Sequence, residues 1–244
     1  MEYLLIVLAG FAGGFINVIA GGGSMITLPA LTLLGFGMDV ANGTNRIGIL
    51  MQNIAATYKF SKSKITPYKK AVFCLIPAVI GAVIGTVIAV QIDQGLMKKI
   101  VGFIFLGMSI LVLFKPNLWE KPHEGIKNKY LSMLVFFLIG IYGGFIQAGV
   151  GIFIMLALVL LEGLDLLKTN SVKVLVILGF TLVSLIIFAL NGKVDFLAGI
   201  ILGIGSMTGG YVSAKLSIKK GTKFIRYILF AVVILSAIKY IFFS

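Results

Sequence analysis

The acidic, thiol and imidazole side chains of this chain are few, and their positions exclude most catalytic chemistry. The carboxylates all fall at a chain end or in a predicted loop: Glu2, Asp39, Asp93, Glu120, Glu124, Glu162, Asp165 and Asp195. They form no acid pair for general acid–base catalysis and supply no intramembrane acid of the kind that proton and cation transporters use. One cysteine, Cys74, and one histidine, His123, leave neither a disulfide nor a Cys/His metal cluster. We therefore expect no enzyme activity, no catalytic residue, no metal and no cofactor.

Two glycine-rich interruptions of apolar sequence are the best candidates for a binding site. They are GGGS at 21–24 and GVG at 149–151. Backbone N–H groups freed at membrane depth cannot bond to lipid, so such breaks persist where they line a cavity. Half-helices beginning at Ser24 and near Ile152 would aim two positive N-terminal ends at that cavity, which favours an anion. The alternative is that the glycines only allow close helix packing. Because the break occurs twice, we favour the site.

The predicted substrate-binding set combines the two breaks with the polar side chains near them. It comprises Asn17, Gly21, Gly22, Gly23, Ser24, Thr27, Asn45, Arg46, Gln147, Gly149, Gly151, Asn170 and Lys173. Asn and Gln donate hydrogen bonds without carrying charge, which suits an anion that must also be released. Arg46 and Lys173 could attract an anion, or they could be charges that snorkel to the membrane interface, and the sequence favours neither reading.

The elements that must position these residues are membrane helices. Of the 244 residues, 59% are hydrophobic and 12% are charged, with a mean hydropathy of +1.11. A soluble domain is about half apolar and a quarter charged, so this composition excludes a soluble enzyme and a disordered chain. The net charge of +13 comes from lysines in short loops, which is the positive-inside pattern and not a nucleic-acid surface. The partners we expect are the lipid bilayer and a small anion, with no nucleic acid. A homo-oligomer is compatible with the sequence.

The fold class that follows is an all-α polytopic membrane protein. Apolar runs long enough to span occur at about 43–61, 71–91, 96–115, 170–190, 194–214 and 222–242. Regions 2–36 and 129–163 each look like a helix, a glycine break and a half-helix. This gives about eight transmembrane helices, or ten segments if the half-helices are counted. Residues 1–115 form a first membrane repeat, 116–128 a cytoplasmic linker and 129–244 a second repeat. The first residues lack the basic region of a signal peptide, so we expect them to be mature sequence.

Internal similarity indicates that the two halves arose by duplication. GFAGGFINVIAG at 10–21 returns as GIYGGFIQAGVG at 140–151, which makes Gln147 the counterpart of Asn17. Thr44-Asn45 returns as Thr169-Asn170, and the pair Gly81/Gly85 returns as Gly205/Gly209. We expect the latter two glycine pairs to serve helix packing.

Loop charges predict that the repeats are inverted. The loop 59–70 carries five lysines and should be cytoplasmic, whereas its counterpart 191–195 is neutral. The turn 91–97 and its basic counterpart 215–223 show the reverse bias. Equivalent loops would then lie on opposite sides of the membrane, with both termini outside the cytoplasm.

The glycine-rich motifs resemble those of a known family. GFAGGFINVIAGGGSMITLPAL followed by ANGTN, and the echo GIYGGFIQAGVG followed by KTNSVK, are similar to the TauE/SafE sulfite-exporter family of membrane permeases. The resemblance covers nearly the whole chain. The second repeat departs from the first at Gly151-Ile152-Phe153 and lacks a counterpart of Pro29.

The resemblance implies a transporter in the plasma (inner) membrane of a prokaryote. Its expected substrate is a sulfur-containing anion such as sulfite or an organosulfonate, moved by alternating access and held between the half-helix N-termini. The alternatives are an anion channel, a carrier of a different small anion, and a membrane-embedded enzyme or assembly factor. The missing intramembrane acids and histidines count against the enzyme.

Overall fold

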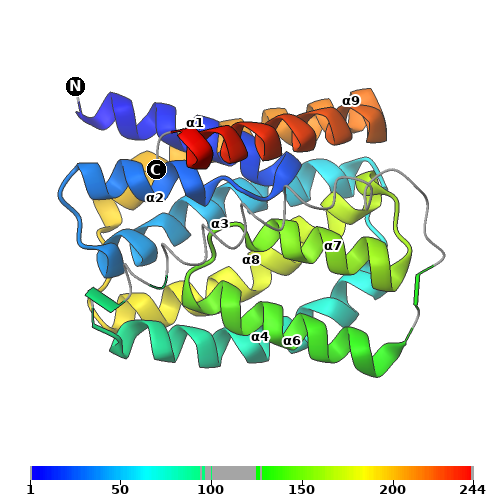
Figure 1. Ribbon diagram of the computed structural model, residues 1–244, viewed down its shortest axis with the longest axis horizontal. Helices are drawn as coiled ribbons and strands as arrows, with labels where there is room; N and C mark the ends of the chain where they lie inside the picture. The colour runs from blue at the N-terminus through cyan, green and yellow to red at the C-terminus, as the bar shows by residue number, and fades with distance from the viewer. Residues whose placement is uncertain (1, 94, 97–99, 101–124, 127, 243–244) are drawn as a thin grey trace.

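A computed structural model describes residues 2–93, 95–96, 100, 125–126 and 128–242 of the chain. Within these residues every element is an α-helix, which agrees with a helical membrane protein (Figure 1). The helices are α1 (Glu2–Ala20), α2 (Ser24–Leu33), α3 (Met38–Lys62), α4 (Tyr68–Gln91), α6 (Lys129–Phe145), α7 (Val150–Glu162), α8 (Leu166–Leu190) and α9 (Phe196–Phe242). The predicted span 96–115 and most of the linker 116–128 lie outside the described residues.

The two broken helices are confirmed, and each folds back on itself. α1 ends at Ala20 and α2 begins at Ser24, as predicted, while α7 begins at Val150, two residues before the predicted Ile152. Gly13 of α1 faces Thr27 of α2, so the two helices run antiparallel. In both pairs the second helix returns toward the end of the molecule from which the first came (Figure 1).

The sequence-equivalent helices of the two halves run in opposite directions. α1, α3 and the first part of α9 run from left to right in Figure 1, whereas α6, α8 and α4 run from right to left. Contacts between neighbours agree: Gly199 and Gly203 of α9 meet Ile47 and Met51 of α3 in parallel order. Both first helices pack on a helix of the other half, α1 against α9 and α6 against α4.

The repeated glycine pairs are sites of close helix packing, as predicted. A Cβ at Gly85 of α4 would lie 2.7 Å from the carbonyl carbon of Ile141 of α6. A Cβ at Gly209 of α9 would lie 2.9 Å from that of Phe11 of α1. Real Cβ atoms essentially never come within 3.0 Å of such an atom, so these glycines let one backbone rest on another.

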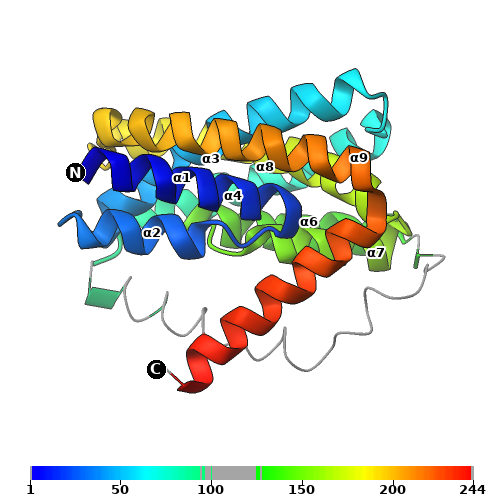
Figure 2. The ribbon, with the colours of Figure 1, turned by 90° about the horizontal axis from the view of Figure 1, so that it is seen from above.

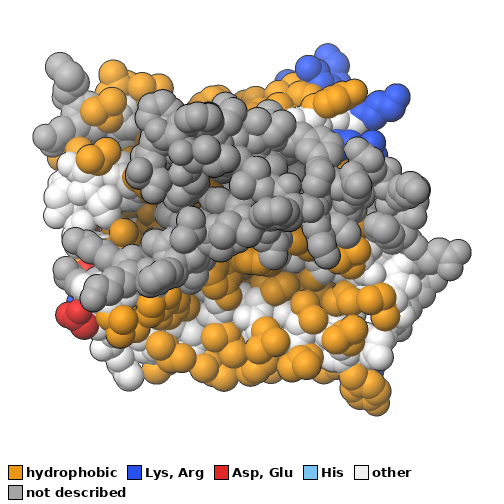
Figure 3. Space-filling view, in the orientation of Figure 1, with side chains coloured by type: hydrophobic (Ala, Val, Ile, Leu, Met, Phe, Trp, Pro, Cys, Tyr) orange, Lys and Arg blue, Asp and Glu red, His pale blue; other side chains and the backbone are white. Residues whose placement is uncertain are grey.

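Four of the described helices are long and apolar enough to cross a membrane: α1, α4, α8 and α9 up to Ile228. α3 has 25 residues but is less apolar than these four helices, because several of its buried residues are polar: Asn42, Thr44, Asn45, Arg46, Gln52 and Asn53. Apolar side chains cover most of the lower half of the face seen in Figure 3, and Lys and Arg side chains gather at its upper right. The exposed lysines of the α3–α4 loop and of α9 near its bend lie at this end: Lys62, Lys64, Lys69, Lys215, Lys219, Lys220 and Lys223.

Several helix boundaries differ from the apolar spans. α8 begins at Leu166, ahead of the predicted 170, because the Asp165 side chain accepts hydrogen bonds from the N–H groups of Leu167 and Lys168. α3 begins at Met38 instead of 43, which places Asn42 inside the helix. The last two predicted spans form one element, α9, bent at Gly221, where φ is 69° (Figure 2). In place of the loop expected at 215–223, the structure therefore has helix on both sides of a bend at Gly221.

Candidate functional site

The two glycine breaks meet in space. A Cβ at Gly21 would lie 2.6 Å from the Cα of Gly151, and a Cβ at Gly151 would lie less than 3.0 Å from the Cα of Gly21. Gly21 also adopts a φ of +86°, which side chains with a Cβ rarely adopt. The breaks at the starts of α2 and α7 are thus in direct backbone contact.

The crossing leaves hydrogen-bond donors without protein partners. The amide of Gly21 bonds back to α1, but those of Gly22, Gly23 and Ser24 have no backbone acceptor. The same holds for the amide of Gly151 in the second break. Free N–H groups at a helix N-terminus, together with the helix dipole, form a site suited to an anion.

Lys173 of α8 lies at the end of α1, which belongs to the other half of the chain. Its side chain is fully buried. The Nζ atom donates to the carbonyl oxygens of Asn17 (3.2 Å) and Val18 (2.7 Å) and to Oδ1 of Asn170 (2.7 Å). Both carbonyls are in the last turn of α1, where the helix dipole is negative, and the carbonyl of Asn17 also accepts from the amide of Gly21. Asn170 adds a bond of its own, from Nδ2 to the carbonyl of Ile19.

Arg46 of α3 makes the reciprocal contact at the end of α6. It too is fully buried. Nη1 donates to the carbonyl of Gly143 (3.3 Å) and to Oε1 of Gln147 (3.2 Å), and Nη2 donates to the carbonyl of Gly144. The guanidinium also stacks over the ring of Phe188, 4.6 Å from its centroid. Each half therefore holds the broken helix of the other half with a buried basic side chain.

The burial of Arg46 and Lys173 rules out snorkelling. Both residues have a relative exposure of 0%. The sequence placed them near the interface because it started their helices four to five residues late. The first turns of α3 and α8 are polar, so the apolar runs in the sequence begin only after them. In the described residues no carboxylate pairs with either side chain.

Asn45 and the adjacent Arg46 together contact both breaks. Its Nδ2 lies 3.3 Å from Oγ of Ser24, the first residue of α2, while Arg46 contacts the second break. Ser24, Thr27 and Asn45 are all buried. Oγ1 of Thr27, Oδ1 of Asn45 and Nε of Arg46 have no hydrogen-bond partner. Unpaired buried polar atoms are costly, and these three belong to residues of α2 and α3 that lie close to the breaks, where a ligand could complete their bonding.

Asn17 and Gln147, counterparts in the sequence, have different roles in the structure. Asn17 accepts from Lys173 through its backbone, and its Cβ packs against Gly23. Gln147 has a φ of 61° and uses its side chain, which accepts from Arg46 and donates to Oγ1 of Thr181. The structure thus joins Asn170 and Lys173 to the end of α1 near Asn17, and Arg46 to Gln147 at the end of α6, with Gly149 as the left-handed N-cap of α7.

Sequence reasoning missed a polar layer behind Arg46. Thr86 of α4 donates to the carbonyl of Gly144 (3.1 Å) and contacts Oγ of Ser184 (2.8 Å). Gln147 reaches Thr181 on the same helix as Ser184. Each of these hydroxyl groups is a lone polar group within an apolar span. The sequence therefore indicates that it is buried, but not which residue it contacts.

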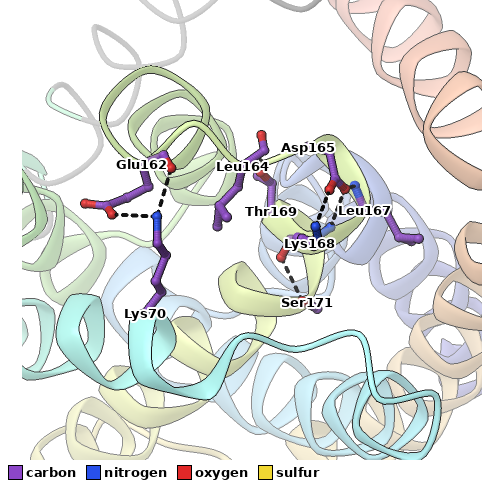
Figure 4. A network of polar contacts seen from close by, with 8 residues as sticks. All are labelled: Lys70, Glu162, Leu164, Asp165, Leu167, Lys168, Thr169 and Ser171. Atoms are coloured by element: carbon purple, nitrogen blue, oxygen red, sulfur yellow. Dashed lines mark hydrogen bonds and ion pairs between the residues drawn. The ribbon is translucent and has the colours of Figure 1, made fainter. Parts of the chain in front are cut away.

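The carboxylates of the described residues lie away from this site. Glu162 pairs with Lys70, and Asp165 pairs with Lys168, at the lysine-rich end (Figure 4). Asp39 pairs with Lys193 in the turn at the opposite end. The site is therefore built from basic and neutral groups alone.

From this arrangement we expect anion binding to be independent of carboxylates. Asp165→Asn retains a side-chain acceptor at the α8 cap and should change the free energy of unfolding by less than about 1 kcal/mol. Asp39→Asn removes the charge of a largely buried carboxylate that pairs with Lys193, and should lower the melting temperature. In both variants the affinity for any anion that the parent binds, measured by isothermal titration on the purified protein, should match the parent. Loss of binding by either folded variant would contradict a carboxylate-free site.

Comparison with known proteins gives a consistent family assignment. A family model described as "Sulfite exporter TauE/SafE" matches residues 6–240. A probable membrane transporter protein of Haemophilus influenzae is 31% identical over 218 residues, covering 89% of this chain and 86% of the relative. One from a Sinorhizobium species is 29% identical, covering 95% and 89%. The probable membrane transporter protein YfcA of Escherichia coli is 27% identical, covering 92% and 83%. No solved structure gives a significant match.

Proposed function

The chain belongs to the TauE/SafE sulfite-exporter family of membrane transporters, and from this premise we propose that it carries a small sulfur-containing oxyanion, such as sulfite or a sulfonate. We place it in the plasma membrane of a prokaryote as a multi-pass protein with both termini outside the cytoplasm. The relatives are described as transporters, which favours transport over catalysis.

The crossing of the two glycine breaks carries this proposal. Free amides at the start of α2 lie beside Asn45 and Arg46, and the buried Arg46 guanidinium has no carboxylate partner among the described residues. Such groups favour a bound anion and disfavour a cation. Sulfite and sulfonates present several acceptor oxygens on one small head group, which suits several donors converging on one point.

We further propose that α1–α4 and α6–α9 belong to inverted repeats that rock against each other. The opposite directions of α1 and α6 support this, as do the reciprocal contacts of Arg46 and Lys173. Each re-entrant pair comes from one side of the membrane, so the crossing would lie between the two access routes. Alternating access in such folds turns around a fixed central site.

The orientation can be tested by cysteine labelling. The native Cys74 is buried, so single exposed cysteines report cleanly. Lys62→Cys in the basic α3–α4 loop should react only with a reagent that reaches the cytoplasm. Asn191→Cys, at the opposite end, should react with an impermeant maleimide applied to intact cells. Labelling of both from the same side would overturn the inverted arrangement.

Transport itself is tested in proteoliposomes. Sulfite uptake should saturate with concentration, and unlabelled sulfite inside the vesicles should accelerate entry of labelled sulfite. Counterflow of this kind requires a carrier that reorients with its substrate bound. Flux that does not saturate and shows no counterflow would favour the anion channel instead.

Ser24→Ala is the sharpest single-residue test of the site. The Ser24 oxygen accepts from Asn45, which leaves its O–H free to donate to the anion. Loss of one hydrogen bond to a charged group should weaken sulfite binding by about 1.5–3 kcal/mol. Ser217→Ala removes a hydroxyl that is equally buried but far along α9, and should leave the dissociation constant unchanged. Equal affinities for the Ser24 variant and the parent would exclude the α2 N-terminus as the binding point.

A further inference from the structure

We infer that the two buried basic residues have different roles: Arg46 contacts the transported oxyanion through the Nε edge of its guanidinium, whereas Lys173 is a positioning residue that fixes the end of α1. The inference rests on the proposed function, because it assumes that an oxyanion occupies the crossing of the breaks. The two residues make nearly symmetric contacts with the broken helices, but we assign them different roles.

Lys173 has no donor left for a ligand. An ammonium group carries three N–H bonds. The structure gives Nζ three oxygen acceptors, on Asn17, Val18 and Asn170, and sets the sulfur of Met155 3.6 Å away. These partners surround a side chain with no exposed surface. A ligand could bond to Nζ only by displacing a carbonyl of α1, so the role of this residue is to hold the helix end.

Arg46 has donors to spare. A guanidinium carries five N–H bonds, and those of Nη1 both have acceptors, Gly143 and Gln147. Nη2 makes one bond, to Gly144, and Nε makes none. Nε and Nη2 lie on one edge of the planar group. Two N–H bonds on one edge match two oxygens of a carboxylate, sulfite or sulfonate.

The surroundings favour a ligand over a packing defect at this edge. One face of the guanidinium is covered by Phe188, and the end of the group is fixed to the last turn of α6. The next residue, Asn45, contacts Ser24 at the start of α2 and also keeps a free atom, Oδ1. The unpaired edge thus belongs to a residue held beside both breaks, where the free amides of 22–24 lie.

The chain contains a matched control. Arg226 is the only other arginine in the sequence, and its Nε is also without a partner. It lies on α9 beyond the bend at Gly221, and it is half-buried. A response that merely reflects an unpaired Nε, or nonspecific anion binding, would therefore appear at Arg226 as well.

The test is a titration of arginine-labelled protein. With ¹⁵N-arginine in the full chain in nanodiscs, the two Nε–H signals are assigned with Arg226→Lys and followed as sulfite, and separately methanesulfonate, is added. We expect the Arg46 signal to shift and saturate at the concentration that half-saturates transport, and the Arg226 signal to stay in place. A silent Arg46 signal while transport persists would overturn the inference alone. A protein that neither transports nor binds either anion would overturn the proposed function with it.

Two variants test the division of labour independently. Arg46→Lys keeps the charge but loses the Nε edge, and should raise the sulfite dissociation constant about tenfold or more, as expected for hydrogen bonds to a charged group. Lys173→Met should lower the melting temperature, because the end of α1 loses its three bonds to Nζ, while saturating sulfite should still shift the Arg46 signal. Parental affinity in Arg46→Lys would contradict the assignment. If Lys173→Met does not fold, the Arg46 titration and the Arg46→Lys affinity still decide the question.

Discussion

Gly151→Ala should abolish the sulfite transport that we propose. The added methyl group would lie less than 3.0 Å from the Cα of Gly21, so it would meet backbone and not a side chain that can turn aside. The methyl group would force the two breaks apart, which would separate the free amides of α2 from Arg46. Overpacking of a fixed contact costs about 1–3 kcal/mol, so the melting temperature should fall as well. Uptake into proteoliposomes and thermal unfolding measure the two effects.

The control separates crowding from backbone strain. Gly35 has a φ of +89°, close to that of Gly21, but a Cβ there would have nothing within 4 Å. Gly35→Ala should therefore cost only the left-handed penalty of about 1–2 kcal/mol and retain transport. Gly21→Ala combines both costs and should be the most damaging of the three. Normal transport by a folded Gly151→Ala protein would show that the breaks need not touch.

Gly85→Val and Gly209→Val should damage the fold without changing the binding site. Their Cβ atoms would lie within 3.0 Å of the backbone of α6 and α1 respectively, the two broken helices. We expect each variant to accumulate poorly and to unfold at a lower temperature, with a loss of about 1–3 kcal/mol or more. In the protein that survives, sulfite should still bind with parental affinity. Because the contacts are equivalent, the two losses should be similar in size.

Thr208→Val is the matched control for this pair. Thr208 is the neighbour of Gly209 on α9 and is exposed, and the hydroxyl that Val would replace by a methyl group bonds within the same helix, to the carbonyls of Ile204 and Gly205. This variant should accumulate and unfold as the parent does. If Gly85→Val instead folded normally and lost anion affinity, the packing interpretation would be wrong and the glycine pair would belong to the site.

The sequence alone determined the class of protein and its segmentation. The apolar composition and the glycine interruptions depend only on local properties, namely the hydrophobic length of a helix and the conformational freedom of glycine. These properties placed the start of α2 at Ser24 and the packing role of Gly85 and Gly209, and both are confirmed. Family membership also followed from a pattern along the chain and is confirmed by the match over residues 6–240.

Only the tertiary structure decided what the buried polar residues contact. Arg46 and Lys173 could have faced the interface, since nothing along the chain reports which helix end lies opposite a side chain about 100 or more residues away in sequence. Their partners are carbonyls of Gly144 and Val18, at sequence separations of 98 and 155 residues. A carbonyl leaves no mark in the residue types, so no pattern could predict it. Burying a basic group without hydrogen bonds is costly. The stable packing is therefore one in which Arg46 and Lys173 each bond to carbonyls at the end of the other half's broken helix.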